Sequence, residues 1–126
     1  MKILIIDDDV SATVALKSLL MTKGNFEVDV AYTGRDGLDQ MVTAPCDLLV
    51  LDVMLPNFSG IEVCRAMNAD ERLKHIPVVL ISVLPINSAD FSKMMEDFKV
   101  MPFVKGMIEK PFTLDELVME IEKAMR

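Results

Sequence analysis

The sequence has few of the residues that build several common kinds of site. Among its 126 residues there is no tryptophan, and there are only two cysteines and one histidine. Two isolated cysteines, Cys46 and Cys64, are too few for a disulfide framework or a cysteine-based zinc site. The histidine, His75, lies in the polar stretch "RLKHIP", where no neighbouring group suits it to catalysis or to carrying a phosphate. Cys64 shares a helical register with Met67, which favours a small buried side chain.

Long apolar runs and an excess of positive charge are also missing. No apolar stretch approaches the ~20 residues that a membrane-spanning helix needs. The opening "MKILII" meets Asp7 too soon to form the core of a signal peptide. The formal net charge of −7 argues against direct binding to a nucleic-acid backbone. We therefore expect a cytoplasmic chain that neither enters a membrane nor binds nucleic acid directly.

The composition is typical of a compact folded domain. Hydrophobic residues make up 52% of the chain and charged residues 26%, which differs from the composition of disordered proteins. A chain of this length buries most of its apolar surface without disulfides or metals. Because no repeat, low-complexity tract or linker interrupts it, we expect one domain over residues 1–126.

Five short apolar runs alternate with segments of helical periodicity. The expected strands are 2–6, 26–31, 47–51, 77–81 and 106–109. Three of these runs are continuously apolar, as expected for strands covered on both faces. The alternation predicts an α/β fold with a five-stranded parallel sheet and five helices on its two faces. Right-handed crossovers favour the doubly wound, flavodoxin-like strand order 2-1-3-4-5.

Apolar residues recur at helical spacing between the strands, and we expect them to pack in the core. In the first helix they are Ala12, Ala15, Leu16, Leu19 and Leu20; in the fourth they are Phe91, Met94, Met95 and Phe98. Two residues have the side chains of helix N-caps. Asp9 is expected to cap the first helix, and Thr113 the last.

Polar and charged residues stand where four of the strands end. Asp7 and Asp8 follow the first strand, Asp52 the third, Ser82 the fourth and Lys110 the fifth. In the order 2-1-3-4-5 these strands are neighbours about 4.8 Å apart, and ligands bind beside their carboxyl ends. We therefore expect all five side chains at one edge of the sheet. There Asp8 and Asp52 can share a cation, and Lys110 can reach toward Asp52.

The crowding of aspartates indicates a divalent cation. Two carboxylates ~4 Å apart repel each other by ~4 kcal/mol at an effective dielectric constant near 20. A dication relieves that repulsion, and a set of oxygen ligands suits Mg²⁺, with Mn²⁺ as a substitute. Together with the Lys110 ammonium and the Ser82 hydroxyl, the site indicates phosphoryl transfer. Asp52 would be the nucleophile and would become an aspartyl phosphate.

Four motifs in order resemble the receiver domain of bacterial two-component response regulators, the CheY-like superfamily. They are "LIIDDD", "VLDVMLPNFSG", "IPVVLIS" and "EKPF", and the resemblance spans essentially the whole chain. It implies that Asp52 accepts phosphate from a sensor histidine kinase or a phosphotransfer protein. It also implies that Mg²⁺ is held by Asp7, Asp8, Asp52 and the backbone carbonyl of Met54. Ser82 and Lys110 would bind the phosphoryl group, and the Lys110–Pro111 bond would be cis.

The resemblance also bears on activity and output. It implies a signalling domain and not an enzyme, one that catalyses only its own phosphorylation and dephosphorylation. A downstream protein target would bind the surface formed by helix 4, strand 5 and helix 5. A homodimer that forms on phosphorylation is a second mode of output within this resemblance.

The sequence departs from the family at three places. Val83 follows Ser82 where the family usually has a small residue, and Met107 stands where a tyrosine or phenylalanine is usual. The segment from Ser82 to Lys110 is several residues longer than usual. We therefore expect helix 4 and the loop before strand 5 to signal differently.

Two alternatives stay open at this point. One is an interaction module that keeps the fold but does not use phosphorylation, which the departures at Val83 and Met107 would permit. The other is a phosphatase of the haloacid-dehalogenase type, which also uses an aspartate nucleophile and Mg²⁺. Such an enzyme needs a second aspartate two residues after the nucleophile as acid and base. Met54 occupies that position here.

Overall fold

Strands and helices alternate along the part of the chain that the computed structural model describes, residues 1–84 and 88–126. The strands are β1 (Lys2–Ile6), β2 (Glu27–Ala31), β3 (Leu48–Asp52), β4 (Val78–Ser82) and β5 (Val104–Glu109). The helices are α1 (Val10–Lys23), α2 (Gly34–Thr43), α3 (Gly60–Asn68), α4 (Ala89–Phe98) and α5 (Leu114–Ala124). Part of the long Ser82–Lys110 segment, residues 85–87, lies outside the described residues.

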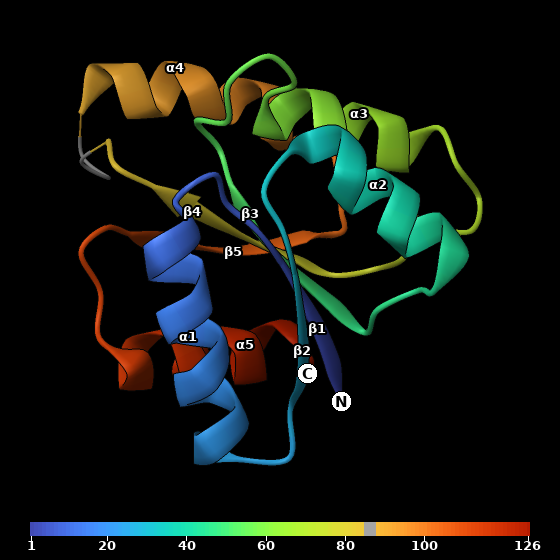
Figure 1. Ribbon diagram of the computed structural model, residues 1–126. Coiled ribbons are helices and arrows are strands. Elements are labelled where there is room, and N and C mark those ends of the chain that lie inside the picture. Colours follow the sequence, from blue (N-terminus) through green and yellow to red (C-terminus); the bar gives the residue numbers. More distant parts are fainter. Residues whose placement is uncertain (85–87) are drawn as a thin grey trace.

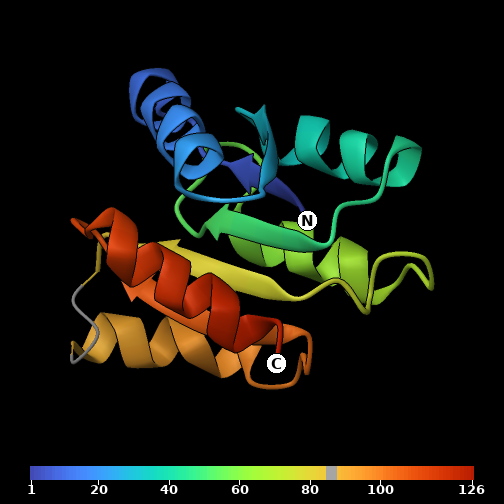
Figure 2. The same ribbon diagram turned by 90° about the horizontal axis from the view of Figure 1, so that it is seen from below.

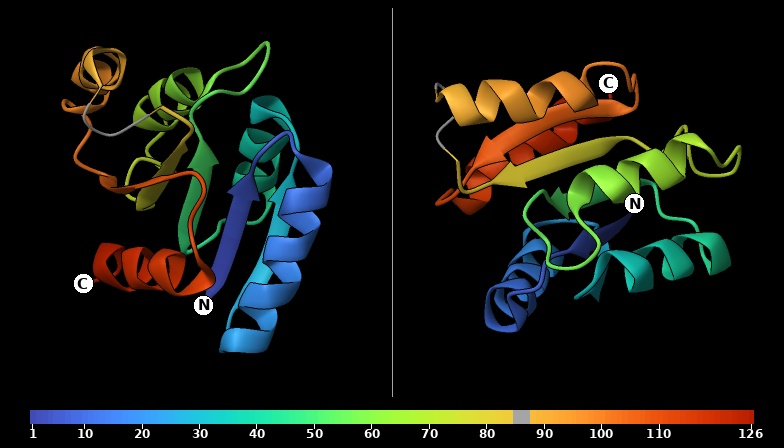
Figure 3. Two further views of the ribbon diagram at one scale, coloured as in Figure 1. Left: turned by 90° about the vertical axis from the view of Figure 1, so that its left-hand side faces the viewer. Right: turned by 90° about the horizontal axis from the view of Figure 1, so that it is seen from above.

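All strand pairs are parallel, and their order is β2-β1-β3-β4-β5. This confirms the predicted doubly wound, flavodoxin-like architecture. Helices α1 and α5 cover one face of the sheet, and α2, α3 and α4 cover the other (Figure 1). The strands point the same way, so the loops that follow β1 and β3 meet at one edge of the sheet (Figure 3).

The sheet separates two apolar cores, because side chains alternate between its faces. In β1, for example, Ile3 and Ile5 pack toward α1 and α5, whereas Leu4 and Ile6 pack toward α2, α3 and α4. Every residue of β3 and β4 is buried. Truncation of a buried leucine or isoleucine in these strands to alanine lowers the free energy of unfolding by about 2–5 kcal/mol. The central strands therefore form a stiff base for the residues at their ends.

The strand boundaries differ from the predicted ones by one or two residues. Strand β2 begins at Glu27 and not at residue 26, and strands β3 and β4 each begin and end one residue later than predicted, so that Asp52 and Ser82 are the last residues of their strands. Strand β5 begins at Val104, two residues before the predicted start at Gly106, and its register against β4 shifts between Val78 and Val79, which skips Lys105. The polar Lys105 separates Val104 from the run that predicted this strand.

The predicted core face of α1 was wrong in part. Leu20 is fully buried, but Leu19 is 50% exposed, and Ala12 and Ala15 are exposed as well. Thr13 takes an inward position, and its hydroxyl donates to the Asp9 carbonyl at 2.6 Å, which satisfies its polar group. As a result α1 carries an apolar outer surface.

The two predicted helix caps are confirmed. Asp9 Oδ1 accepts a hydrogen bond from the Ala12 amide at 3.0 Å, and Thr113 Oγ1 accepts one from the Glu116 amide at 3.1 Å. Each cap satisfies an amide that has no partner within its helix. Along residues 1–84 and 88–126, no helix combines the length and the apolar character that crossing a membrane requires.

Both cysteines are buried and free, as expected for Cys64. Burial raises the pKa of the Cys46 thiol to about 11 and that of the Cys64 thiol to about 12. Because the thiolate is the reactive and metal-binding form, both side chains serve as small apolar groups.

Candidate functional site

Three carboxylates meet at the carboxyl edge of the sheet. Asp7 follows β1 and Asp52 ends β3, and both are buried, with 5% and 4% of their surface exposed. Asp8 is exposed beside them. One oxygen from each of the three side chains lies within 4.8 Å of the others. The structure thus brings together the three aspartates that the sequence predicted at this edge.

Asp7 and Asp52 are oriented in the same way. Asp7 Oδ1 accepts from the amide of Asp9 at 3.0 Å, and Asp52 Oδ1 accepts from the amide of Met54 at 2.9 Å. Each carboxylate therefore has one oxygen fixed by the backbone two residues further on. The Oδ2 atom of each faces the same ammonium group, that of Lys110.

Lys110 joins the ends of β1, β3 and β4. Its Nζ lies 2.9 Å from Asp7 Oδ2 and 3.4 Å from Asp52 Oδ2, while its amide donates to the Ser82 carbonyl at 2.8 Å. The Lys110–Pro111 peptide is cis, as the resemblance implied. The sequence predicted contact with Asp52, but the shorter ion pair is with Asp7.

Ser82 lies at the end of β4 and is fully buried. Its Oγ accepts a hydrogen bond from the amide of Leu84 at 3.0 Å. The following residue, Val83, is 55% exposed. The hydroxyl is thus held at the edge of the site by its own loop, with an apolar side chain at the surface next to it.

Burial and charge perturb two groups of the site. Burial raises the pKa of Asp52 and the negative charge of Asp7 adds to this, although the amide of Met54 and the charge of Lys110 act in the opposite direction. For Lys110, burial lowers the pKa, but the hydrogen bond to Asp7 and the charges of Asp52 and Asp7 outweigh it, so the pKa is raised. The site therefore holds a positively charged lysine between two carboxylates whose negative charges repel each other.

The donor set fits a magnesium ion. The three clustered side chains offer carboxylate oxygens, which are the ligands that Mg²⁺ prefers. Three carboxylates against one ammonium leave negative charge that a dication would neutralise. Asp9 does not belong to this cluster, because its carboxylate caps α1. Met54 has an exposed side chain, 54% of its surface being accessible, and its backbone carbonyl stays a predicted ligand.

The loop between β3 and α3 is fixed close to Asp52. A Cβ atom on Gly60 would lie 2.8 Å from the Val53 Cα and 3.0 Å from the Asp52 carbonyl oxygen, so only glycine permits this approach. Asn57 has a φ of 66°, in the left-handed region. Arg35 stacks over the Phe58 ring at 4.7 Å from its centroid and ties the loop to α2.

An apolar groove of about 540 Å³ opens beside Asp7 and Lys110. It runs between α1 and the segment that leads into α5, and its lining includes Ala12, Leu16, Leu19, Val83 and Phe112. The groove is a consequence of the orientation of α1, which turns apolar side chains toward it. It offers an approach to the carboxylates from the α1 face of the sheet.

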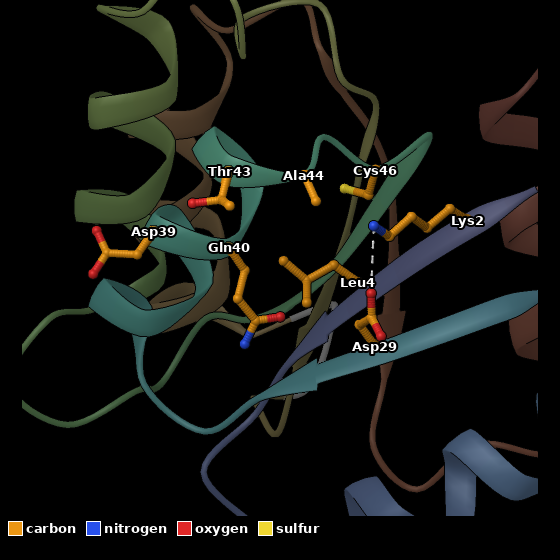
Figure 4. A pocket seen from close by; sticks show the side chains of 8 residues that line it. All are labelled: Lys2, Leu4, Asp29, Asp39, Gln40, Thr43, Ala44 and Cys46. Carbon is orange, nitrogen blue, oxygen red and sulfur yellow. Dashed lines mark ion pairs between the residues drawn. The ribbon is translucent and has the colours of Figure 1, made fainter.

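A separate pocket of about 290 Å³ lies near the other end of β1 (Figure 4). Side chains of α2 line one side of it, and the ion pair between Lys2 and Asp29, at 3.5 Å, lies on the other (Figure 4). Cys46 faces this pocket with its thiol protonated. None of the predicted site residues lines it, so the candidate site is the one at the carboxyl edge.

The response regulator receiver domain is the family whose model matches residues 3–122 of the chain. The chain belongs to this family. It is 36% identical over 123 residues to the chemotaxis protein CheY of Pseudomonas aeruginosa, covering 98% of this chain and 94% of that protein. It is 32% identical over 125 residues to the response regulator ArlR of Staphylococcus haemolyticus, covering 98% of this chain and 52% of ArlR. The receiver domain thus spans about half the length of ArlR.

Solved structures agree with this fold. The chemotaxis protein CheY4 of Vibrio cholerae superposes with a TM-score of 0.83 at 24% identity, covering 98% of this chain and 97% of that one. A sensor protein of Polaromonas sp. superposes with a TM-score of 0.82 at 26% identity, covering 98% and 94%. The chain is therefore a CheY-like receiver domain of two-component signalling.

One feature of the site could not be anticipated from the residue types. The contact between Lys110 and Asp7 depends on which way two side chains turn beyond the ends of their strands. The strand order places both residues at one edge but fixes neither direction. The only sequence signal for it was the pair Asp7–Asp8, which placed two carboxylates next to each other.

Proposed function

We propose that this receiver domain is a phosphoacceptor in which Asp52 takes a phosphoryl group from the phosphohistidine of a sensor histidine kinase or phosphotransfer protein. The observation that supports this most strongly is the pair of buried carboxylates, Asp7 and Asp52, that share the Lys110 ammonium beside Asp8. Such a set provides a nucleophile, an oxygen-lined cation site and a fixed positive charge for phosphoryl oxygens.

The transfer step is a displacement at phosphorus. An oxygen of Asp52 forms the new O–P bond as the N–P bond of the phosphohistidine breaks, and the electron pair stays on the imidazole nitrogen. Bound Mg²⁺ would supply charge neutralisation at the phosphoryl oxygens. Lys110 would stabilise the same oxygens with its ammonium, which already lies 3.4 Å from Asp52 Oδ2. The Ser82 hydroxyl would donate a hydrogen bond to another of the phosphoryl oxygens.

The chain would act on itself alone, and not as an enzyme on other substrates. A new phosphoryl group would compete with Asp7 for the ammonium of Lys110. The amide of Lys110 donates a hydrogen bond to the Ser82 carbonyl, which joins the ends of β4 and β5. This connection supports a switch that reaches β5 and its flanking helices α4 and α5. Those elements form the surface on which we expect a downstream protein to bind.

The groove beside Asp7 supports an approach of the phosphodonor protein from the α1 face. Leu16, Leu19 and Phe112 give that approach an apolar lining, and the groove ends at the site itself. A small phosphodonor would need no such contact. A comparison of transfer from a phosphodonor protein with transfer from a small phosphodonor therefore separates docking from chemistry.

Phosphorylation by acetyl phosphate with Mg²⁺ tests the proposal. Mass spectrometry should show the addition of one phosphoryl group to the wild type and to the matched control Asp97→Asn, whose carboxylate is exposed. Asp52→Asn should not be labelled. Labelling of Asp52→Asn at the wild-type level would assign the acceptor elsewhere. No labelling of the wild type would favour the phosphorylation-independent module, and steady release of phosphate from a phosphomonoester would favour the phosphatase.

A further inference from the structure

The β3–α3 loop, residues 53–59, is attached to the start of α2. Helix α3 lies between α2 and α4 on one face of the sheet (Figure 2). A Cβ atom on Gly34 would lie 2.6 Å from the Phe58 carbonyl oxygen, so the loop backbone rests directly on α2. The next residue, Arg35, places its guanidinium carbon 4.7 Å from the centroid of the Phe58 ring. Two neighbouring residues of α2 therefore contact the same residue of the loop.

The other end of the β3–α3 loop is bonded to the candidate phosphoacceptor. The amide of Met54 donates to Asp52 Oδ1 at 2.9 Å, and the amide of Gly60 donates to the Val53 carbonyl at 3.1 Å. The backbone carbonyl of Met54 is a predicted ligand of the cation. Its position relative to the carboxylates therefore depends on the loop as a whole, which includes the contact with α2.

The loop contains a strained turn between these two ends. The amide of Phe58 donates to the Pro56 carbonyl at 2.7 Å, which closes a three-residue turn around Asn57. Asn57 has a φ of 66°, so this is the γ-turn with positive φ, the rarer and more strained of the two kinds. A strained turn persists only where its surroundings hold it. Because Phe58 is the last residue of this turn, its contacts with α2 are placed to hold the turn in this conformation.

The contact between Arg35 and Phe58 is a cation–π contact at the surface. Arg35 is exposed, and it takes part in none of the ion pairs found in residues 1–84 and 88–126. Phe58 is partly buried and packs against the apolar core between the sheet and helices α2, α3 and α4. A guanidinium over an aromatic face is attracted to the ring, but only modestly at an exposed site. The contact is thus suited to orient a loop and is too weak to be a main support of the fold.

We propose that Arg35 is a positioning residue for the cation site, which acts through Phe58 on the β3–α3 loop. It keeps the loop close to the conformation in which the Met54 carbonyl binds Mg²⁺. A loop that is already ordered loses less conformational entropy when the ion binds, so the affinity for the ion is higher. The inference rests on the proposed phosphoacceptor function, because it concerns the cation that this function needs.

Binding of Mn²⁺ to the full chain, followed by the electron paramagnetic resonance signal of the free ion, measures this effect. Arg35→Gln should weaken binding about two- to fivefold, the range that corresponds to a cation–π contact at the surface. Arg35→Lys keeps a positive charge over the ring and should bind nearly as well as the wild type. Loss of a positive charge by itself strengthens the attraction for a cation, so weaker binding of Arg35→Gln cannot arise from net charge. The control Arg65→Gln makes the same change in charge at an exposed position of α3 and should not weaken binding.

A second variant tests whether the ring is the partner of Arg35. Phe58→Leu keeps an apolar side chain without an aromatic face and should weaken Mn²⁺ binding to a similar extent. Arg35→Gln/Phe58→Leu should bind no more weakly than the weaker of the two single variants, because both changes remove one contact. Additive losses in the double variant would mean that the two residues act independently and would overturn the inference.

Urea unfolding separates positioning of the loop from support of the fold. Arg35→Gln should lose more stability in excess Mg²⁺ than in EDTA, because the loop can relax when no ion is bound. Equal losses in the two buffers, with unchanged Mn²⁺ affinity, would show a purely structural role and would overturn the inference. It would also be overturned if Arg35→Gln bound Mn²⁺ more tightly, or if the wild type did not bind it. Weaker binding by Arg35→Gln would support the inference even if acetyl phosphate failed to label Asp52, so the failure of one proposal is distinguishable from the failure of the other.

Discussion

Lys110 lies closer to Asp7 than to Asp52: its Nζ is 2.9 Å from Asp7 Oδ2 and 3.4 Å from Asp52 Oδ2. The ammonium is thus shared between two buried carboxylates that come from adjacent strands, β1 and β3. Its positive charge offsets the repulsion between the two carboxylates. This arrangement gives Lys110 a structural role in addition to the role in phosphoryl binding that we propose.

Removal of this ammonium should destabilise the domain in a metal-dependent way. Lys110→Gln leaves Asp7 and Asp52 facing each other, and we expect a loss of about 1–3 kcal/mol in EDTA, since the lysine is partly exposed. Mg²⁺ should reduce that loss because it also neutralises the carboxylates. Urea unfolding with and without Mg²⁺ measures both values. Lys74→Gln, which breaks a surface pair with Glu71, should show a smaller loss that Mg²⁺ does not change; an equal loss for Lys110→Gln in both buffers would contradict the explanation.

The raised pKa of Asp52 predicts a pH dependence in the absence of metal. In the pH range between its unfolded and folded pKa values, the folded chain binds more protons at Asp52 than the unfolded chain does, so this residue's contribution to stability falls as pH rises through that range. Asp52→Asn carries no such charge beside Asp7, Asp8 and Lys110. The free energy of unfolding of Asp52→Asn in EDTA should therefore exceed that of the wild type by more at pH 7 than at pH 4. A difference that does not change with pH would show that Asp52 is not disfavoured as an anion.

Binding of the cation should raise the melting temperature. The ion relieves a repulsion that exists only in the folded state, so it stabilises that state, and the stabilisation grows with the free ion concentration c as RT ln(1 + c/Kd). Millimolar Mg²⁺ or Mn²⁺ should shift the wild-type melting curve upward, and chelation should reverse the shift. Asp8→Ala should remove it, whereas Asp36→Ala, in α2, should not. A melting curve that does not respond to Mg²⁺ would count against the site.

The phosphorylated state is expected to be long-lived. The resemblance to the family implies that residues two positions past the acceptor and two past the hydroxyl flank the path of the hydrolytic water. Here they are Met54, with 54% exposure, and Leu84, which is half-buried; neither can orient water by hydrogen bonding. The exposed side chain of Val83 is expected to narrow this path further. Met54→Asn/Leu84→Glu should lose phosphate faster in a decay assay, and a decay as slow as that of the wild type would refute the shielding by these side chains.

Docking of the phosphodonor protein should depend on the outer surface of α1. Leu19→Ser removes an apolar side chain from the groove beside the site and should slow transfer from a protein phosphodonor, while labelling by acetyl phosphate stays normal. The control Val100→Ser changes a residue with 76% exposure that lies outside that groove. Slower labelling of Leu19→Ser by both donors would place the effect in the chemistry and not in docking.

The strand order and the edge that carries the site were predictable for a simple physical reason. Buried parallel strands are apolar throughout, so the first polar residue after each run marks its carboxyl end. This rule located Asp7, Asp52 and Ser82 without any knowledge of tertiary contacts, and Lys110 follows Glu109 directly at the end of the fifth run. Elements with a weaker apolar pattern were less predictable, as the early start of β5 at Val104 shows.

The buried face of α1 was not predictable in the same way. Apolar residues occur almost all round this helix, so periodicity does not select one face. Packing against the sheet selects Thr13 and Leu20 and leaves Leu19 outside. Likewise, the shorter ion pair of Lys110 with Asp7 depends on the orientation of the aspartate side chains. The amides two residues beyond Asp7 and Asp52 fix that orientation by hydrogen bonds.

The two cysteines have a practical consequence for the redox behaviour of this domain. Cys46 and Cys64 are buried, and the pKa values of about 11 and about 12 keep them as thiols at neutral pH. Oxidants and maleimide dyes react with accessible thiolates, so neither native thiol should react with them. A single cysteine placed at an exposed position, such as Val100→Cys, would then accept one fluorophore with no need to remove the native thiols.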